Sequence, residues 1–191
     1  MEKKKIIVAA TGASGQTLLV KCLEIIRQNP DFETHLIMSK NAELTLCHEL
    51  NYTPQEVKKM VDYSYDPDEI GACPASGSYQ TRGMLIVPCS MKTVAGIHSG
   101  YADNLILRAA DVTIKEQRPL VLAARETPLS AIHLRNLYEL SMISGVRIVP
   151  PMLTFYHKPE MIDDMVYHVA AKLLEPFGIE AGRYCRWTGL S

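Results

Sequence analysis

Five short apolar runs, each about as long as a buried strand, alternate with segments of helical periodicity along the chain. The runs occupy residues 5–9, 34–38, 84–87, 120–123 and 147–149. Continuous apolar runs are typical of strands buried on both faces, and their alternation with helices indicates a parallel sheet wrapped by helices. The sequence therefore predicts an α/β fold, with three αβα layers in a single domain over residues 1–191.

The helical segments carry recognisable signals. After Gly15, apolar residues recur at helical spacing, and they form a stripe of Leu18, Leu19, Cys22, Leu23 and Ile26. Thr53 and Glu56 have the spacing of a capping box, which predicts a helix to about residue 62. Further helices are expected at 41–49, 90–99, 104–116, 130–144 and 159–177, with a long loop at 63–82 and an aromatic, basic tail from Glu180.

Charge and cysteine content exclude several classes of partner. Twenty basic and twenty-one acidic side chains give a net charge of -1, which provides no general field for nucleic acid or an anionic membrane. The apolar run near the N-terminus is shorter than a signal-peptide core of about 7–15 residues. Five cysteines without a C-x-x-C pair predict a cytoplasmic protein without a metal site.

The turn at residues 11–15, TGASG, follows the first strand and opens the first helix. Free backbone amides and the helix dipole favour a phosphate at such a position, although a tight turn without a ligand is an alternative. The turn lacks the G-x-G-x-x-G pattern of dinucleotide sites and the G-K-[ST] of a Walker A loop, and Ser39 and Lys40 end the second strand without an acidic residue. The pattern favours a mononucleotide such as FMN.

A second polar turn, at residues 88–93, follows the third predicted strand and begins another helix. Ser90 is a natural cap for that helix, so capping alone is the competing interpretation. Two such turns at one edge of a sheet form a cleft, and residues 74–78 precede the strand and could close over it. Patterns of metalloproteases, α/β-hydrolases and glycosidases are missing.

Taken together, nine short words in fixed order between residues 6 and 187 resemble the UbiX-type flavin prenyltransferases. They are TGASG (11–15), SK (39–40), PASGS (74–78), PCS (88–90), DNLI with RAADV (103–112), KE with RPLVL (115–122), RETP (125–128), IHL (132–134) and FYH (155–157).

The resemblance implies a flavodoxin-like Rossmann domain that joins a dimethylallyl group from dimethylallyl monophosphate to reduced FMN. The prenylated FMN would pass to a UbiD-type decarboxylase. Similar proteins are described as the small subunit of phenolic or hydroxyaromatic acid decarboxylases, and the family tends to form dodecamers.

The resemblance also implies roles for individual residues. The expected FMN contacts are Gly12, Ala13, Ser14, Ser39, Ser90, Met91, Lys92, Thr93 and Arg125. The expected pocket for the prenyl phosphate contains Arg108, Lys115, Tyr156 and Lys172, and the expected catalytic residues are Glu126, Ser14, Glu49 and Lys115. Family members commonly have Arg where this chain has Lys172, and lysine lacks the planar fork that binds phosphate at two points.

These residue types suit the implied reaction. Cations stabilise a leaving phosphate without a metal, and aromatic faces such as those of Tyr156 or Trp187 stabilise an allylic cation. A carboxyl such as Glu126 can move protons at the flavin and at the phosphate. Ser14 can orient groups or relay protons at the same edge of the flavin.

Simpler interpretations exist for several of these residues. Arg108 with Asp111, and Lys172 with Glu175, have the spacing of surface ion pairs. His133 and His157 fit structural donors better than metal ligands or bases, and Trp187 in the tail at 180–191 fits a subunit-interface anchor.

Two other functions remain open at this point. One is an FMN-dependent decarboxylase of the cysteine-decarboxylase type, which carries a catalytic His on the helix after the first turn. This chain has no His between Gly15 and Asn29. The other is a non-catalytic flavin-carrying subunit of a phenolic acid decarboxylase.

Overall fold

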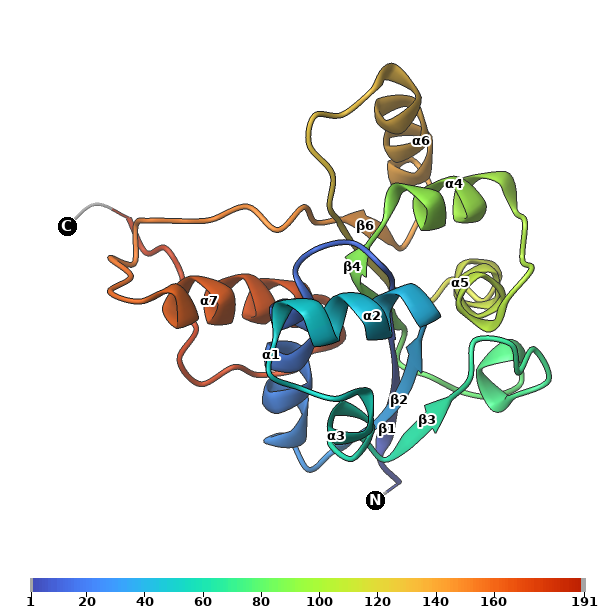
Figure 1. Ribbon diagram of the computed structural model, residues 1–191, viewed down its shortest axis with the longest axis horizontal. Coiled ribbons are helices and arrows are strands. Elements are labelled where there is room, and N and C mark those ends of the chain that lie inside the picture. The colour runs from blue at the N-terminus through green and yellow to red at the C-terminus, as the bar shows by residue number, and fades with distance from the viewer. Residues whose placement is uncertain (1, 190–191) are drawn as a thin grey trace.

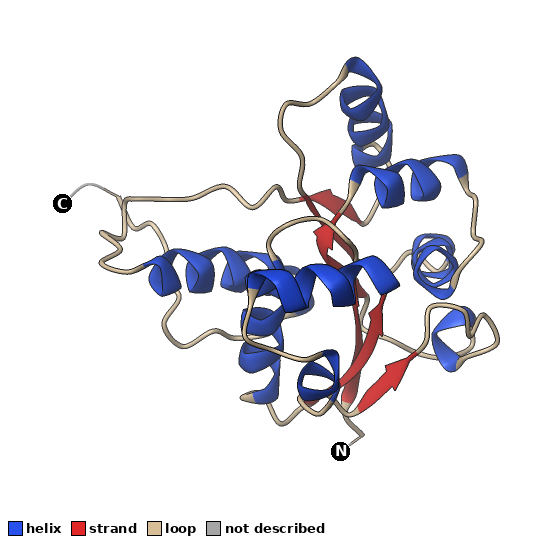
Figure 2. Ribbon diagram, viewed as in Figure 1, coloured by secondary structure: helices blue, strands red, loops and turns tan. Residues whose placement is uncertain are grey.

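The computed structural model describes residues 2–189, and its centre is a six-stranded parallel sheet (Figures 1 and 2). The strands are β1 (Lys4–Ala10), β2 (Phe32–Met38), β3 (Tyr63–Tyr65), β4 (Met84–Cys89), β5 (Leu120–Ala124) and β6 (Val146–Ile148). Their order in the sheet is β3-β2-β1-β4-β5-β6. The predicted parallel α/β sheet is confirmed, and this order is that of the doubly wound Rossmann sheet.

Helices cover both faces of the sheet and complete the three predicted layers. One face carries α1 (Gln16–Arg27), α2 (Lys40–Glu49), α3 (Pro54–Lys58) and α7 (Ile162–Leu174), whose buried residues share one apolar cluster. The other face carries α4 (Met91–Ser99), α5 (Leu105–Lys115) and α6 (Ala131–Ser141), which share a second cluster. Two short 3-10 helices, Cys73–Ala75 and Glu175–Phe177, lie in the connections. Because continuous apolar strands face a helical layer on each side, the sheet is buried on both faces, as predicted.

Side-chain caps fix where most of these helices begin. Ser39, Ser90 and Asn104 each accept a hydrogen bond from an amide in the first turn of α2, α4 and α5. Thr53 and Glu56 form the predicted capping box, although α3 ends at Lys58 rather than near residue 62. On α6, Ser130 is the cap, and His133 Nδ1 accepts from the Ser130 amide instead of donating.

The segment predicted as a loop at 63–82 begins with a strand instead. Tyr63–Tyr65 pairs with β2, and His35 lies opposite Tyr63. Three residues at the sheet edge have too little apolar content to show a strand locally, so the pairing with β2 decides the conformation. The rest of the segment is held by Arg118, whose guanidinium donates to the carbonyls of Gly77 and Tyr79.

The C-terminal part also differs from expectation. The predicted helix at 159–177 begins at Ile162. Residues 150–161 form an irregular segment with a turn at 156–157, and Asp164 accepts hydrogen bonds from the Glu160 and Met161 amides. Among residues 2–189, no helix is long and apolar enough to cross a membrane.

Candidate active site

The two polar turns meet at the point where the strand order reverses. Chain leaving β1 crosses to α1 on one face, and chain leaving its neighbour β4 crosses to α4 on the other face. Open α/β sheets bind ligands in the crevice at such a switch point. The two turns are joined directly, because the buried Thr11 hydroxyl accepts from the Ser90 amide at 2.8 Å and donates to the Pro88 carbonyl at 2.9 Å.

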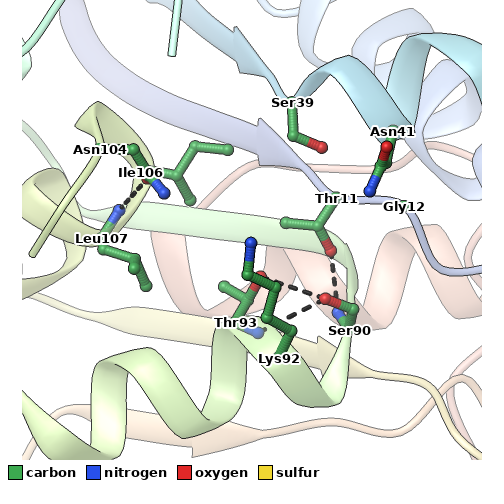
Figure 3. Close-up of a pocket in the computed structure, with 10 residues that line it drawn as sticks. All are labelled: Thr11, Gly12, Ser39, Asn41, Ser90, Lys92, Thr93, Asn104, Ile106 and Leu107. Carbon is green, nitrogen blue, oxygen red and sulfur yellow. Dashed lines mark hydrogen bonds between the residues drawn. The ribbon is translucent and has the colours of Figure 1, made fainter. Parts of the chain in front are cut away.

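A small pocket of about 90 Å³ opens between these turns (Figure 3). Five of the predicted FMN contacts line it: Gly12, Ser39, Ser90, Lys92 and Thr93. Five lining residues were not predicted, and these are Thr11, Asn41, Asn104, Ile106 and Leu107. Asn104 could have been found as the cap of α5, whereas Ile106 and Leu107 look like ordinary core positions in the sequence.

The end of the pocket at α4 is suited to an anion. Ser90 Oγ accepts from the Thr93 amide, whereas the amides of Met91 and Lys92 donate to no other group among the described residues. The first amides of a helix carry a partial positive charge. Lys92 adds a full charge, and Figure 3 shows its side chain extending toward the middle of the pocket.

The first turn approaches α2 closely and needs glycine to do so. A Cβ on Gly12 would lie 2.6 Å from the Cβ of Asn41, and Gly15 has a φ of 112°. Both features favour glycine, for reasons of space at Gly12 and of backbone conformation at Gly15. Within residues 2–189, the amides of Gly12, Ala13 and Ser14 donate no hydrogen bond, so they are available to a ligand.

The N-terminus of α1 is occupied by a carboxylate of the protein itself. Glu49, at the end of α2, accepts hydrogen bonds from the amides of Gly15 at 3.0 Å and Gln16 at 2.9 Å. Partial burial raises the pKa of Glu49, but hydrogen bonds from Ser14, Gln16 and Gly15 and the charge of Arg125 outweigh it, so the pKa lies below its usual value. An incoming phosphate therefore has the amides of residues 12–14 and of α4 to bind, and not those that begin α1.

Arg125 and Glu126 follow β5 at the same edge of the sheet. The Arg125 amide donates to the Cys89 carbonyl, which places the loop beside the second turn. Both side chains are exposed. Glu126 Oε1 accepts from the Thr127 amide at 3.0 Å, which leaves Oε2 open to solvent or to a ligand.

The residues expected around the prenyl phosphate form two separate groups within one chain. Arg108 and Lys115 lie on α5. Lys172 lies on α7 across the sheet, near Tyr156 in the segment before α7. The ion pairs considered from the spacing are present, with Arg108 at 2.8 Å from Asp111 and Lys172 at 2.7 Å from Glu175. Glu175 also raises the pKa of Lys172.

Lys115 is also distant from the pocket along its own helix. The pocket is lined by the first turn of α5, and Lys115 is the last residue of that helix, about 15 Å away at 1.5 Å per residue. Lys115 pairs with Glu116 beside Gly77 of the PASGS segment. The described residues contain no group of three or more His, Cys, Asp or Glu side chains that could hold a metal ion.

Comparisons with known proteins also indicate a flavin-binding protein. The Flavoprotein family profile matches residues 1–174. A probable UbiX-like flavin prenyltransferase of Escherichia coli is 50% identical over 186 residues, which are 97% of this chain and 94% of the relative.

Two solved structures are similar over almost the whole chain. A dodecameric FMN-dependent UbiX-like decarboxylase from Escherichia coli O157:H7 has a TM-score of 0.94 at 50% identity, and covers 97% of this chain and 100% of that chain. AnUbiX (PadA1), in complex with FMN and dimethylallyl pyrophosphate, has a TM-score of 0.96 at 45% identity, with 100% of both chains covered.

Proposed function

This chain belongs to the Flavoprotein family and to the UbiX-like flavin prenyltransferases within it, and we propose that it joins a dimethylallyl group from dimethylallyl monophosphate to reduced FMN. The observation that carries the proposal is the pocket at the switch point, where unpaired amides, hydroxyls and one lysine face a crevice in a chain with relatives of this kind.

The residues present fit FMN. The free amides of Gly12, Ala13 and Ser14 and of Met91 and Lys92, with Lys92 as the cation, suit a single phosphate. Ser39 and Thr93 add hydroxyls. Pockets for small organic ligands usually measure about 300–1,000 Å³, so the pocket of about 90 Å³ holds only part of a flavin. Arg125, which follows β5 at the same edge of the sheet, would bind a polar edge of the flavin ring.

The residues expected around the prenyl phosphate lie on both faces of the sheet, and this supports a site to which more than one copy of the chain contributes. Because α5 and α7 lie on opposite faces of one sheet, Lys115 and Lys172 meet only if a second copy contributes one of them. The solved relative from E. coli O157:H7 is dodecameric. We infer a homo-oligomer of that kind, with the tail at 180–191 at a subunit interface; Leu190 and Ser191 lie outside the described residues.

In this assembly the charged side chains act on the leaving phosphate. Arg108, Lys115 and Lys172 neutralise the charge that develops on phosphate as the allylic C–O bond breaks, and Tyr156 donates to a phosphate oxygen. When bound, reduced FMN supplies the electron-rich ring that accepts the prenyl group. Glu126 moves a proton through its free Oε2. Ser14 and Glu49 hold the edge of the first turn together.

The alternatives receive less support. The α1 helix, Gln16–Arg27, contains no His to serve as the catalytic residue of a cysteine decarboxylase. A subunit that only carries flavin would need no cations beyond those of the FMN pocket, whereas α5 and α7 also carry Arg108, Lys115 and Lys172. We propose that the product passes to a UbiD-type decarboxylase in the cytoplasm. The absence of disulfides among the described cysteines fits a reducing compartment.

The test is mass spectrometry of flavin extracted after anaerobic incubation with reduced FMN. Parallel reactions receive dimethylallyl monophosphate or dimethylallyl pyrophosphate, and a third receives no prenyl donor. A gain of one prenyl unit with the monophosphate is the expected result. If the flavin gains mass only with dimethylallyl pyrophosphate, the pyrophosphate and not the monophosphate is the donor. Unchanged flavin in all three reactions contradicts the proposal.

A further inference from the structure

A buried histidine lies directly behind Tyr156 and takes no part in the function described above. His168, on α7, is 5% exposed, and its ring stacks on His157 with centroids 4.2 Å apart and planes 5° from parallel. Tyr156 meets His168, Trp187 and His157 edge-on, with ring centroids 5.4, 5.5 and 5.8 Å apart. These three rings together position the Tyr156 ring.

The hydrogen bonds of His168 fix which ring nitrogen carries its proton. Its Nε2 lies 3.1 Å from the carbonyl oxygen of Cys185, which can only accept, so Nε2 is protonated. Burial is the main cause that lowers the pKa of His168, which favours a neutral ring with an unprotonated Nδ1. The Thr154 hydroxyl, 2.9 Å from Nδ1, then donates to it.

This tautomer also determines the direction of the Tyr156 hydroxyl. Tyr156 Oη lies 3.0 Å from the same Nε2, and a protonated Nε2 has no lone pair to offer. The single Nε2 hydrogen is shared between the Cys185 carbonyl and the Tyr156 oxygen, so Tyr156 does not donate to His168 and its own hydrogen is free. Tyr156 is 41% exposed, and its charge helps raise the pKa of Lys172, so the two side chains are near each other.

We propose that His168 is a positioning residue that turns the Tyr156 hydroxyl hydrogen outward, beside Lys172, to donate to the phosphate of the prenyl donor. The inference rests on the proposed function, because that function supplies the phosphate. Fully ionised phosphate oxygens only accept hydrogen bonds, so a tyrosine whose hydrogen was directed into the protein would contribute nothing to binding.

The experiment compares three variants in the assembled protein. His168→Leu removes both ring nitrogens, His168→Gln keeps an amide N–H near the position of Nε2, and Tyr156→Phe removes the hydroxyl. Affinity for dimethylallyl monophosphate is measured by calorimetry in the presence of oxidised FMN, and KM and kcat are measured in the transfer reaction. FMN affinity and the melting temperature are recorded for each variant, and Tyr138→Phe, on the exposed face of α6, is the control.

His168→Leu and Tyr156→Phe are each expected to weaken prenyl-phosphate binding and raise KM about tenfold, with FMN affinity unchanged. His168→Gln should recover most of the loss. The double variant His168→Leu with Tyr156→Phe should be no worse than either alone, because both changes remove the same hydrogen bond.

The inference would be overturned if the double variant lost affinity by the product of the two single losses. It would also be overturned if His168→Leu bound dimethylallyl monophosphate as the parent does. If the parent transfers no prenyl group, the proposed function fails. The calorimetric comparison then still decides whether His168 acts through Tyr156 on a bound prenyl phosphate. If His168→Leu does not fold, His168→Gln in the parent and in the Tyr156→Phe background provides the same comparison.

Discussion

The hydroxyl of Thr11 accepts a hydrogen bond from the amide of Ser90 across 79 positions of sequence. Together with the bond from the same hydroxyl to the Pro88 carbonyl, it fastens the turn after β1 to the turn after β4. This buried side chain therefore adds to the backbone bond from the Thr11 amide to the Pro88 carbonyl, and together they join the walls of the pocket.

Thr11→Val keeps the shape of this side chain and removes both bonds. Leaving the Pro88 carbonyl and the Ser90 amide without this partner should lower the free energy of unfolding by about 1–3 kcal/mol and weaken FMN binding. Urea unfolding and FMN titration measure the two effects. Thr113→Val is the control, because Thr113 is equally buried but bonds only to the Ala109 carbonyl within α5. Equal FMN affinity in Thr11→Val and Thr113→Val would show that this link does not shape the site.

Ser14→Asp places a negative charge beside the free amides of the first turn and close to Glu49. Repulsion between this carboxylate and the flavin phosphate should abolish FMN binding. Ser14→Asn, which is similar in size and uncharged, should bind FMN far better. Flavin absorbance and fluorescence during titration distinguish the two, and equal binding by both variants would place the phosphate elsewhere.

Glu49 should make the stability of the fold depend on pH. Its pKa is lowered in the folded state, so its contribution is fully present above the ordinary glutamate value of about 4.3 and is lost as the pH falls through the lower folded value. At neutral pH, Glu49→Gln should reduce the free energy of unfolding by about 1 kcal/mol, as the loss of a helix cap does.

Urea unfolding at several pH values checks this prediction. The difference between the parent and Glu49→Gln should shrink toward zero in acid. Glu160→Gln is the control, since the Glu160 side chain is exposed and makes no hydrogen bond or ion pair among the described residues. If the difference in free energy of unfolding stays constant down to low pH, the charge of Glu49 is not the cause of that difference.

Glu126→Gln preserves the shape of the side chain but cannot move a proton. General acid–base catalysis is typically worth about 10²–10⁴ in rate, so turnover should fall by that factor while FMN affinity stays intact. Anaerobic single-turnover kinetics with extracted flavin provide the measurement. Turnover close to the parent would leave Glu126 with a structural role beside Arg125.

Removal of residues 183–191 should weaken the oligomer and lower activity together. Within the chain, the tail makes the surface ion pairs of Arg183 with Asp163 and of Arg186 with Glu175. Its Trp187 also packs against Tyr156, which is a second reason for activity to fall. Surface ion pairs contribute little, so the fold should persist while the interface is lost. Light scattering and turnover, measured on the same samples, check the prediction. A truncated protein with unchanged mass and unchanged turnover would place the tail outside the interface.

Much of the fold could be predicted because it rests on local patterns. The apolar runs identified five of the strands, and Thr53 and Ser90 marked helix starts through their own side chains. The strand Tyr63–Tyr65 escaped prediction because its conformation depends on pairing with β2.

The site was predictable in its chemistry more than in its geometry. The two turns were found because each follows a predicted strand and contains its own hydroxyl residues, with two glycines in the first turn. The tie through Thr11 joins positions far apart in sequence, and nothing local marks it. In the same way, the separation of Lys115 from Lys172 follows from which face each helix covers, and a spacing in the sequence does not show that.

The carboxylate at the start of α1 has a consequence for which nucleotides the crevice accepts. In sheets with this strand order, that helix start is where the pyrophosphate of a dinucleotide rests. Here Glu49 already holds those amides, and a pyrophosphate placed there would face a negative charge. On this geometry Glu49 disfavours the pyrophosphate of NAD or FAD at the start of α1, whereas the free amides of residues 12–14 stay open to a single phosphate.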